Sequence, residues 1–148
     1  MRITTRGRCA LRASLALAKL GTKGKPVSIN CLSEHENISS VFLEQIFFKL
    51  RKAGIVTSIR GPGGGFCFAK QQDELTVKQI LEAAGEDLEL TFCDKSRDSC
   101  NRAGECLSHF IWVEVTELVK NYFAGITISS ILEKYQNPII NPEAEKRE

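Results

Sequence analysis

The sequence has no long uncharged apolar run, a single tryptophan, and few aromatic residues, which make up 7% of its 148 residues. A membrane-spanning helix needs about 20 consecutive apolar residues, so we expect no membrane span. The arginine-rich start, residues 1–12, is not followed by the apolar segment and cleavage site of a secretory signal. The length suits one compact domain and excludes a large multidomain enzyme.

Charged residues are abundant but unevenly distributed along the chain. Residues 1–70 contain 12 Lys and Arg against three acidic residues, a net charge of +9, whereas residues 71–148 carry −7. This polarity is typical of a protein in which one half meets a polyanion. We therefore interpret the first half as a candidate for nucleic-acid binding. A basic, solvated surface without a partner is the alternative that charge alone leaves open.

Six cysteines in a chain without a secretory signal indicate a reducing compartment, and we expect the protein in the cytoplasm. In that compartment thiols serve metals or redox chemistry more often than structural disulfides. Cys9, Cys31 and Cys67 lie within apolar segments. We interpret these three as small buried residues.

Apolar spacing in the first half predicts three helices, over residues 4–20, 28–37 and 39–53. A tight turn joins the second helix to the third, for which Ser39 is a suitable N-cap. This is the outline of a helix-turn-helix. The buried stripe expected on the third helix consists of Leu43, Ile46, Phe47 and Leu50.

A hairpin follows the third helix. Residues 55–59 alternate like a strand, the glycine-rich residues 60–65 must turn, and residues 66–68 return. The glycines let backbone amides approach a phosphate or a groove wall closely, and Arg60 is placed to enter a narrow minor groove. A nucleotide-binding phosphate loop is disfavoured, because neither Lys-Ser/Thr nor a helix follows the glycines. The hairpin is therefore predicted to be a wing.

The second half predicts a helix over residues 76–84, a polar segment over 86–105, a long helix over 106–123 and a short one over 127–135. The expected fold class is mainly α with a small β-hairpin, a winged helix-turn-helix followed by a long helix. The apolar stripe expected on the long helix consists of Leu107, Ile111, Val115, Leu118 and Tyr122.

Three cysteines and a histidine are gathered in the polar segment and the start of the long helix, with the spacing C-x6-C-x5-C-x2-H. Zinc sites usually pair ligands as C-x2-4-C, so a zinc knuckle is disfavoured. Four ligands of this kind suffice for a 2Fe-2S cluster. A helix-surface histidine and a Cys100–Cys106 disulfide switch remain as alternatives. The four residues are Cys93, Cys100, Cys106 and His109.

Together these motifs resemble the Rrf-two family over about residues 1–135, and most closely its iron-sulfur cluster regulators. The resemblance implies a dimeric winged-helix transcription factor whose long helix crosses that of its partner, with the cluster near the dimer interface. Members repress or activate genes in response to cluster supply, iron, nitric oxide or redox state. The segments that carry the resemblance are residues 1–4 (MRIT), 43–46 (LEQI), 50–54 (LRKAG), 60–66 (RGPGGGF) and the cysteine loop.

Residue by residue, the resemblance implies functional sites of two kinds. Glu44 and Gln45 also project away from the buried stripe, where Glu can accept from cytosine and Gln can read adenine, although a solvated helix face is the alternative. The implied DNA contacts are Ser39, Glu44, Gln45, Arg60, Pro62 and Gly63, and the implied cluster ligands are Cys93, Cys100, Cys106 and His109.

Two departures from the family pattern bear on the cluster. Six residues separate Cys93 from Cys100, where the pattern usually has five. The nitric-oxide-sensing branch has an acidic residue near position 8, where this chain has Arg8. Arginine cannot take the part of that carboxylate, which favours a His-ligated 2Fe-2S cluster over a 4Fe-4S cluster.

The expected organisation has four parts: a winged helix-turn-helix DNA-binding domain (1–84), a cysteine-rich cluster-binding loop (85–109), a dimerisation helix with a terminal helix (106–135) and a disordered tail (136–148). We expect an iron-sulfur-dependent transcriptional regulator, not an enzyme. It would bind a pseudo-palindromic promoter site in double-stranded DNA as a homodimer, away from membranes. The alternative, a zinc or thiol switch or a cluster carrier without a specific DNA-binding role, leaves the basic half and the wing unexplained.

Overall fold

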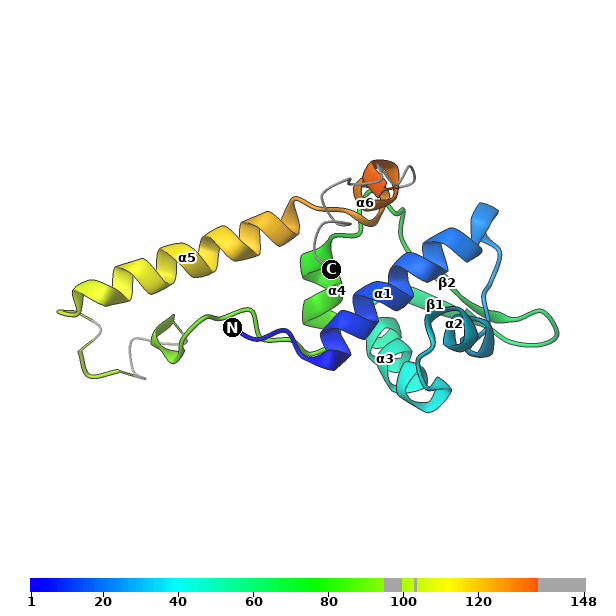
Figure 1. The fold of residues 1–148 in the computed structure, drawn as a ribbon, viewed down its shortest axis with the longest axis horizontal. Coiled ribbons are helices and arrows are strands. Elements are labelled where there is room, and N and C mark those ends of the chain that lie inside the picture. The colour runs from blue at the N-terminus through cyan, green and yellow to red at the C-terminus, as the bar shows by residue number, and fades with distance from the viewer. Residues whose placement is uncertain (95–99, 103, 136–148) are drawn as a thin grey trace, which may run out of the picture.

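One long helix projects from a head, formed by the other α-helices and the hairpin, in the computed structural model, which describes residues 1–94, 100–102 and 104–135 (Figure 1). The predicted fold class is confirmed: the described residues form helices and one antiparallel hairpin. The predicted disordered tail lies outside the described residues. The elements are α1 (Thr5–Leu20), the 3-10 turn η1 (Thr22–Gly24), α2 (Ile29–Glu36), α3 (Ser40–Lys52), β1 (Val56–Ile59), β2 (Gly65–Phe68), α4 (Val77–Ala83), the 3-10 turn η2 (Phe92–Asp94), α5 (Leu107–Ala124) and α6 (Ile128–Tyr135).

Side-chain caps fix where the short helices begin. The Ser39 hydroxyl accepts a hydrogen bond from the Phe42 backbone N–H at the start of α3, as the sequence predicts. Thr76 and Gln79 form a reciprocal capping box on α4, in which each side chain bonds to the other residue's backbone N–H. These caps satisfy backbone donors that have no partner within the helix.

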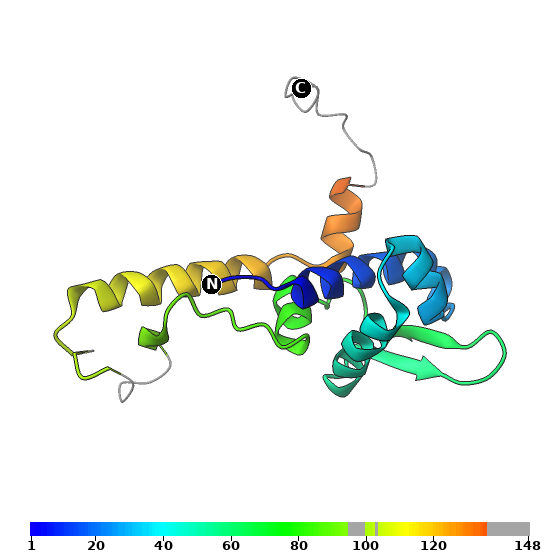
Figure 2. The same ribbon diagram turned by 60° about the horizontal axis from the view of Figure 1, so that its bottom comes forward.

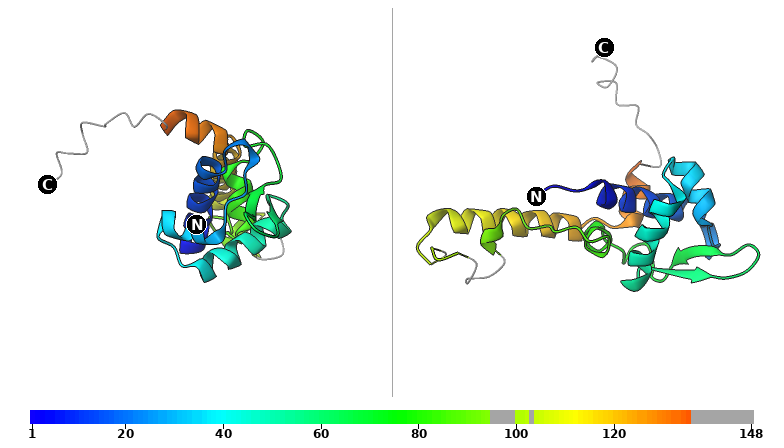
Figure 3. Two further views of the ribbon diagram at one scale, coloured as in Figure 1. Left: turned by 90° about the vertical axis from the view of Figure 1, so that its right-hand side faces the viewer. Right: turned by 90° about the horizontal axis from the view of Figure 1, so that it is seen from below.

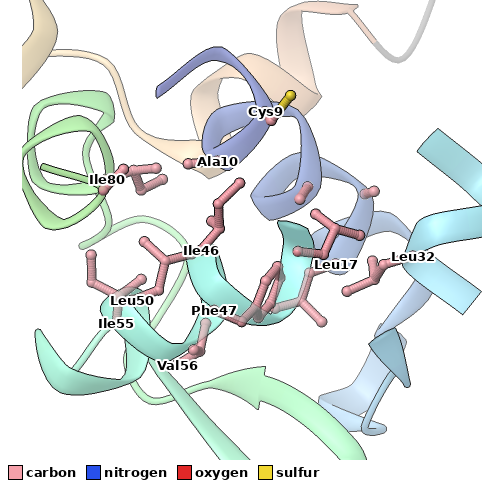
Figure 4. Close-up of a cluster of buried hydrophobic side chains, with 14 of the residues drawn as sticks. Cys9, Ala10, Leu17, Leu32, Ile46, Phe47, Leu50, Ile55, Val56 and Ile80 are labelled. Atoms are coloured by element: carbon pink, nitrogen blue, oxygen red, sulfur yellow. The ribbon is translucent and has the colours of Figure 1, made fainter. Parts of the chain in front are cut away.

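The core of the head lies where α1 and α3 cross (Figure 4). Small side chains on α1 allow this close approach, and the Phe47 ring packs against that of Phe66 with their centroids 4.9 Å apart. Truncating such a buried phenylalanine costs about 3–5 kcal/mol. The predicted stripe on α3 is confirmed, since Leu43, Ile46, Phe47 and Leu50 are all fully buried.

The hairpin is anchored to the segment before α2. Val27 and Phe66 exchange two backbone hydrogen bonds, with N–H···O distances of 2.9 and 2.8 Å. A Cβ atom at Gly65 would lie 2.3 Å from the Val27 carbonyl oxygen, and Gly65 has a φ of +152°. Glycine is therefore required at this position, and it holds the base of the wing against the helix-turn-helix.

The last helix returns to the head. The Val77 N–H donates to the Ile126 carbonyl and the Ile128 N–H to that of Leu75, both at 2.9 Å, and Ile128 is fully buried in the core. In consequence α5 is tied to the head at its C-terminal end, and it extends away from the wing (Figure 1, Figure 2 and the right panel of Figure 3).

The prediction of three small buried cysteines is correct for Cys9 alone. Cys31 is exposed and Cys67 is half-buried. The short helix α2 buries only Leu32 completely, and Cys31, one residue earlier, is rotated by about 100° onto the outer face. Apolar neighbours in the sequence therefore did not place this thiol in the core.

Candidate nucleic-acid interface and cysteine loop

The face of α3 opposite its buried stripe is open to solvent. Glu44 and Gln45 are exposed there, as the sequence predicts, and neither belongs to the core. Ser39 is exposed at the N-terminus of the same helix, where its hydroxyl serves as the cap at 3.4 Å from the Phe42 nitrogen. The three predicted contacts on the helix-turn-helix thus share one accessible edge of the head.

The three predicted wing residues are also accessible. Arg60, Pro62 and Gly63 are exposed at the tip of the hairpin, which is turned by Gly61 and Gly63 at φ values of +99° and +72°. Non-glycine residues rarely adopt such angles, so the glycines define the shape of the tip. Within the described residues Arg60 makes no ion pair, which leaves its guanidinium free for a phosphate or a groove.

Basic residues gather at the end of α3 that leads into the wing. Lys49, Arg51 and Lys52 occupy its last turn. Arg51 donates to the Ser58 hydroxyl of β1 at 3.3 Å and lies 5.8 Å from the centre of the Phe48 ring. This arginine therefore links α3 to the hairpin and places positive charge between them.

Two of the four predicted cluster ligands lie at the start of α5, and the other two precede it in the chain. Cys93 is in η2, Cys100 precedes a turn, Cys106 is the N-cap of α5, and His109 is in its first turn. Most of the chain between Cys93 and Cys100, residues 95–99, lies outside the described residues. Among the residues described, no three His, Cys, Asp or Glu side chains converge closely enough to hold a metal ion.

Local geometry favours the thiolate form of Cys106. Its sulfur lies 3.1 Å from the Ser108 hydroxyl. The hydrogen bond with this hydroxyl, followed by that from the His109 backbone N–H, lowers the pKa of the Cys106 thiol by more than desolvation raises it. The thiolate is the form that binds metals. His109 lies one turn from Cys106 on the same helix end, and its N–H donates to the Cys106 carbonyl at 3.1 Å. The donor chemistry of three thiols and an imidazole, one of the thiols with a lowered pKa, is that of an iron-sulfur cluster, whereas the side chains described do not converge on one point.

The apolar stripe predicted on α5 is largely uncovered. Leu107 is 84% exposed, Leu118 and Tyr122 are each 68% exposed, and Ile111 is 54% exposed. Thr116 is the residue of α5 that is fully buried. Single exposed apolar residues are ordinary, but a continuous apolar stripe along a projecting helix is typical of an interaction surface.

A buried carboxylate ties the segment after α4 to the start of α1. Glu86 accepts hydrogen bonds from the backbone N–H groups of Thr4 and Gly7, at 3.0 and 3.1 Å, and from the Thr4 hydroxyl. Burial raises the pKa of Glu86, but these hydrogen bonds and the Arg6 charge outweigh burial and lower it. Sequence reasoning missed this residue, because a single glutamate in a polar segment carries no periodic signal.

The chain leading to the cysteine loop is held along α5. The Leu90 N–H donates to the Thr116 hydroxyl at 3.4 Å, and the Lys120 ammonium pairs with Glu89. The Met1 ammonium donates to the Leu90 carbonyl at 3.3 Å. Residues 86–90, which precede the cysteines, are thus in contact both with α5 and with the first residues of the chain, including the start of α1.

The helix-turn-helix, the glycine-tipped wing and the basic half together define a winged-helix DNA-binding regulator. Residues 3–134 match the Rrf2 family, described as an iron-dependent transcriptional regulator, and the chain belongs to this family. None of the described helices has the length and apolar character needed to cross a bilayer.

Three relatives illustrate the match. A protein of Neisseria meningitidis serogroup A named as an HTH-type transcriptional regulator is 40% identical over 137 residues, 93% of this chain and 91% of that one. The HTH-type transcriptional regulator IscR of Pectobacterium atrosepticum is 36% identical over 132 residues, 89% and 79% of the two chains. The structure of CymR, the global cysteine regulator of B. subtilis, superposes with a TM-score of 0.75 at 25% identity, covering 90% of this chain and 98% of that one. The protein is accordingly a transcriptional regulator and not an enzyme.

Proposed function

We propose that this chain is an iron-sulfur-dependent regulator that acts in the cytoplasm as a homodimer on a pseudo-palindromic promoter site. The sensing part is supported by the donor set of three thiols and one imidazole within residues 93–109, in which Cys106 is the N-cap of α5 and has a lowered pKa. The similarity to proteins named IscR supports the same assignment. A 2Fe-2S cluster is favoured over a 4Fe-4S cluster because the donor set includes His109.

The homodimer is proposed from the open stripe on α5. Covering its apolar side chains, among them Leu107, Leu118 and Tyr122, with the same stripe of a second copy would remove them from water. Such burial stabilises association by about 25 cal/mol per Å² of apolar surface before the entropy of association is subtracted. A twofold dimer would present two copies of α3 and two wings to adjacent grooves.

DNA binding would then involve two kinds of contact. Glu44 and Gln45 on α3 would meet base edges in the major groove, with Ser39 at the start of that helix. Arg60, with Pro62 and Gly63 at the tip of the wing, would meet the backbone or the minor groove. The acidic second half of the chain would stay away from the phosphates.

A bound cluster would supply a redox-sensitive group whose presence depends on iron and sulfide. Cys93, Cys100, Cys106 and His109 would hold it. Ligation would fix Cys93, Cys100, Cys106 and His109 relative to one another, and residues 86–90 connect this segment to α1 and α5 by the hydrogen bonds of Glu86 and Leu90. This connection is the route by which cluster binding would change the position of the DNA-binding head.

The test is anaerobic purification, followed by the visible spectrum and by iron, sulfide and zinc assays on the same sample. We expect absorbance between about 320 and 600 nm with two iron atoms and two sulfides per chain for a 2Fe-2S site. Cys100→Ala should abolish the absorbance and change promoter affinity, whereas Cys31→Ala, at an exposed thiol outside the loop, should change neither. A colourless protein that contains zinc, even after reconstitution, would contradict the cluster assignment.

A further inference from the structure

An exposed stripe on α3 combines polar and apolar side chains in a way that the proposed contacts do not account for. Val41 is 62% exposed and Phe48 is 57% exposed. With Glu44, Gln45 and Lys49 they line one shallow hollow on the surface of α3. Positions 41, 44, 45 and 48 follow the spacing of one helical face, opposite the buried stripe.

The two apolar side chains of this stripe are exposed, and the Phe48 ring lies beside a positioned arginine. The Arg51 guanidinium lies over the Phe48 ring at 5.8 Å and is fixed by its hydrogen bond to Ser58. Neither Val41 nor Phe48 belongs to the core or packs against it. A helix in the positively charged half therefore presents two apolar groups, one turn before and one turn after its polar pair.

The charge around the stripe limits what can cover it. Residues 1–70 carry a net charge of +9, and Lys49, Arg51 and Lys52 stand in the last turn of the same helix. A polyanion is the partner that this charge attracts. Within the major groove of DNA, the apolar group that a base edge offers is the C5 methyl of thymine, which apolar side chains contact.

We propose that Val41 and Phe48 read thymine methyl groups on either side of the base or bases read by Glu44 and Gln45. This inference rests on the proposed function, in which α3 enters the major groove. Seven residues of helix span about 10 Å, and successive bases of a strand are about 3.4 Å apart. The two thymines are therefore about three base-pair steps apart.

The exposed stripe on α3 would then make three contacts in order: an apolar contact by Val41, hydrogen bonds by Glu44 and Gln45, and a second apolar contact by Phe48. Sequence specificity then comes in part from burial of methyl groups and not from hydrogen bonds alone. Any phosphate contact by Arg60 would be unaffected by this assignment, because phosphate contacts do not distinguish bases.

The experiment begins with selection of a binding site from random-sequence duplexes by the full-length protein at one fixed salt concentration. In the enriched duplex each thymine is then replaced, one at a time, by deoxyuridine, which lacks the methyl group but keeps base pairing. We expect replacement at two positions, about three steps apart, to weaken binding by about threefold to fivefold per half-site, the effect of one buried methyl group.

Variants assign each methyl group to a side chain. Val41→Ala, which lacks both γ-methyl groups, should be less sensitive than the wild type to deoxyuridine at one of the two positions, and Phe48→Ala at the other. Val41→Thr keeps one γ-methyl group and should keep more of the sensitivity than Val41→Ala. Tyr135→Ala is a matched control, since Tyr135 is 64% exposed and lies 5.4 Å from the Lys134 ammonium, in an environment like that of Phe48.

The possible outcomes separate this inference from the proposed function. If a site is enriched but no deoxyuridine replacement weakens wild-type binding, or if both alanine variants keep full sensitivity, methyl readout is wrong and DNA binding stands. If no sequence is enriched over random duplex, the proposed function fails, and the inference fails with it.

Discussion

The carboxylate of Glu86 accepts a hydrogen bond from the backbone N–H of Gly7, with 3.1 Å between the two atoms. The N–H groups in the first turn of a helix have no partner within it and carry partial positive charge, so a carboxylate is stabilised there. A Cβ atom at position 7 would lie 2.6 Å from the Glu86 Cγ. With glutamate at position 86, the packing therefore calls for glycine at position 7.

Gly7→Ala should destabilise the protein, although alanine is ordinarily better than glycine in a helix by about 1 kcal/mol. Crowding against a packed side chain costs about 1–3 kcal/mol and outweighs that gain. In a Glu86→Ala background the obstruction is gone, and Gly7→Ala should then stabilise by up to about 1 kcal/mol. Chemical unfolding of the four proteins at one protein concentration measures the reversal, and an equal effect in both backgrounds would exclude the contact.

Glu86→Gln should lower the free energy of unfolding at pH 7 by about 1.5–3 kcal/mol, the usual value for hydrogen bonds to a charged group. Because the folded state lowers the pKa of Glu86 below 4.5, this stabilisation is complete above that pH and is lost as the pH falls through the folded pKa. The difference between the variant and the wild type should therefore shrink in acid.

The control for the Glu86 measurement is Glu82→Gln. Glu82 is exposed and faces Lys78 across 3.9 Å, a surface pair of the kind that contributes about 0.3–0.5 kcal/mol. Its effect should be small at each pH. A Glu86→Gln effect of the same size and with no dependence on pH would show that the buried carboxylate is not ionised in the folded protein.

Arg60→Ala should weaken binding to duplex DNA and reduce the slope of log affinity against log salt by about one per removed phosphate contact. The arginine is exposed at the tip of the wing, so folding should be unchanged. Titration of a labelled duplex at several salt concentrations gives the slope. Lys134→Ala removes a positive charge from α6, away from the wing, and an equal loss in that variant would mean that only overall charge matters.

Leu118→Glu should dissociate the proposed homodimer. The side chain is 68% exposed in the single chain, so the fold of the protomer should tolerate the change. In the dimer the introduced glutamate side chain would be buried against the second copy as a carboxylate without a partner, which costs several kcal/mol. Light scattering after size exclusion measures the mass, and Asn30→Glu on the exposed face of α2 is the charge-matched control. A wild-type protein that is monomeric at high concentration would refute the dimer.

The sequence by itself determined the helices, the hairpin and their order. Apolar spacing on α3 and α5, the Ser39 and Thr76 caps, and the glycines at the tip of the wing are local signals, which depend on neighbours a few residues away. For this reason the fold class and the accessibility of Glu44, Gln45 and Arg60 followed from the sequence. The grouping of Cys93, Cys100, Cys106 and His109 stays a prediction.

Only the tertiary structure decided which residues meet across long separations. Glu86 reaches the start of α1 from 79 positions away in the sequence, and no periodicity marks a single buried carboxylate. The exposure of Cys31 and Phe48 also depends on which helix faces are covered, and only the packing of the helices against one another determines those faces. Local patterns fix secondary structure because they act within a turn or a strand, whereas burial and long-range hydrogen bonds exist only after the elements have come together.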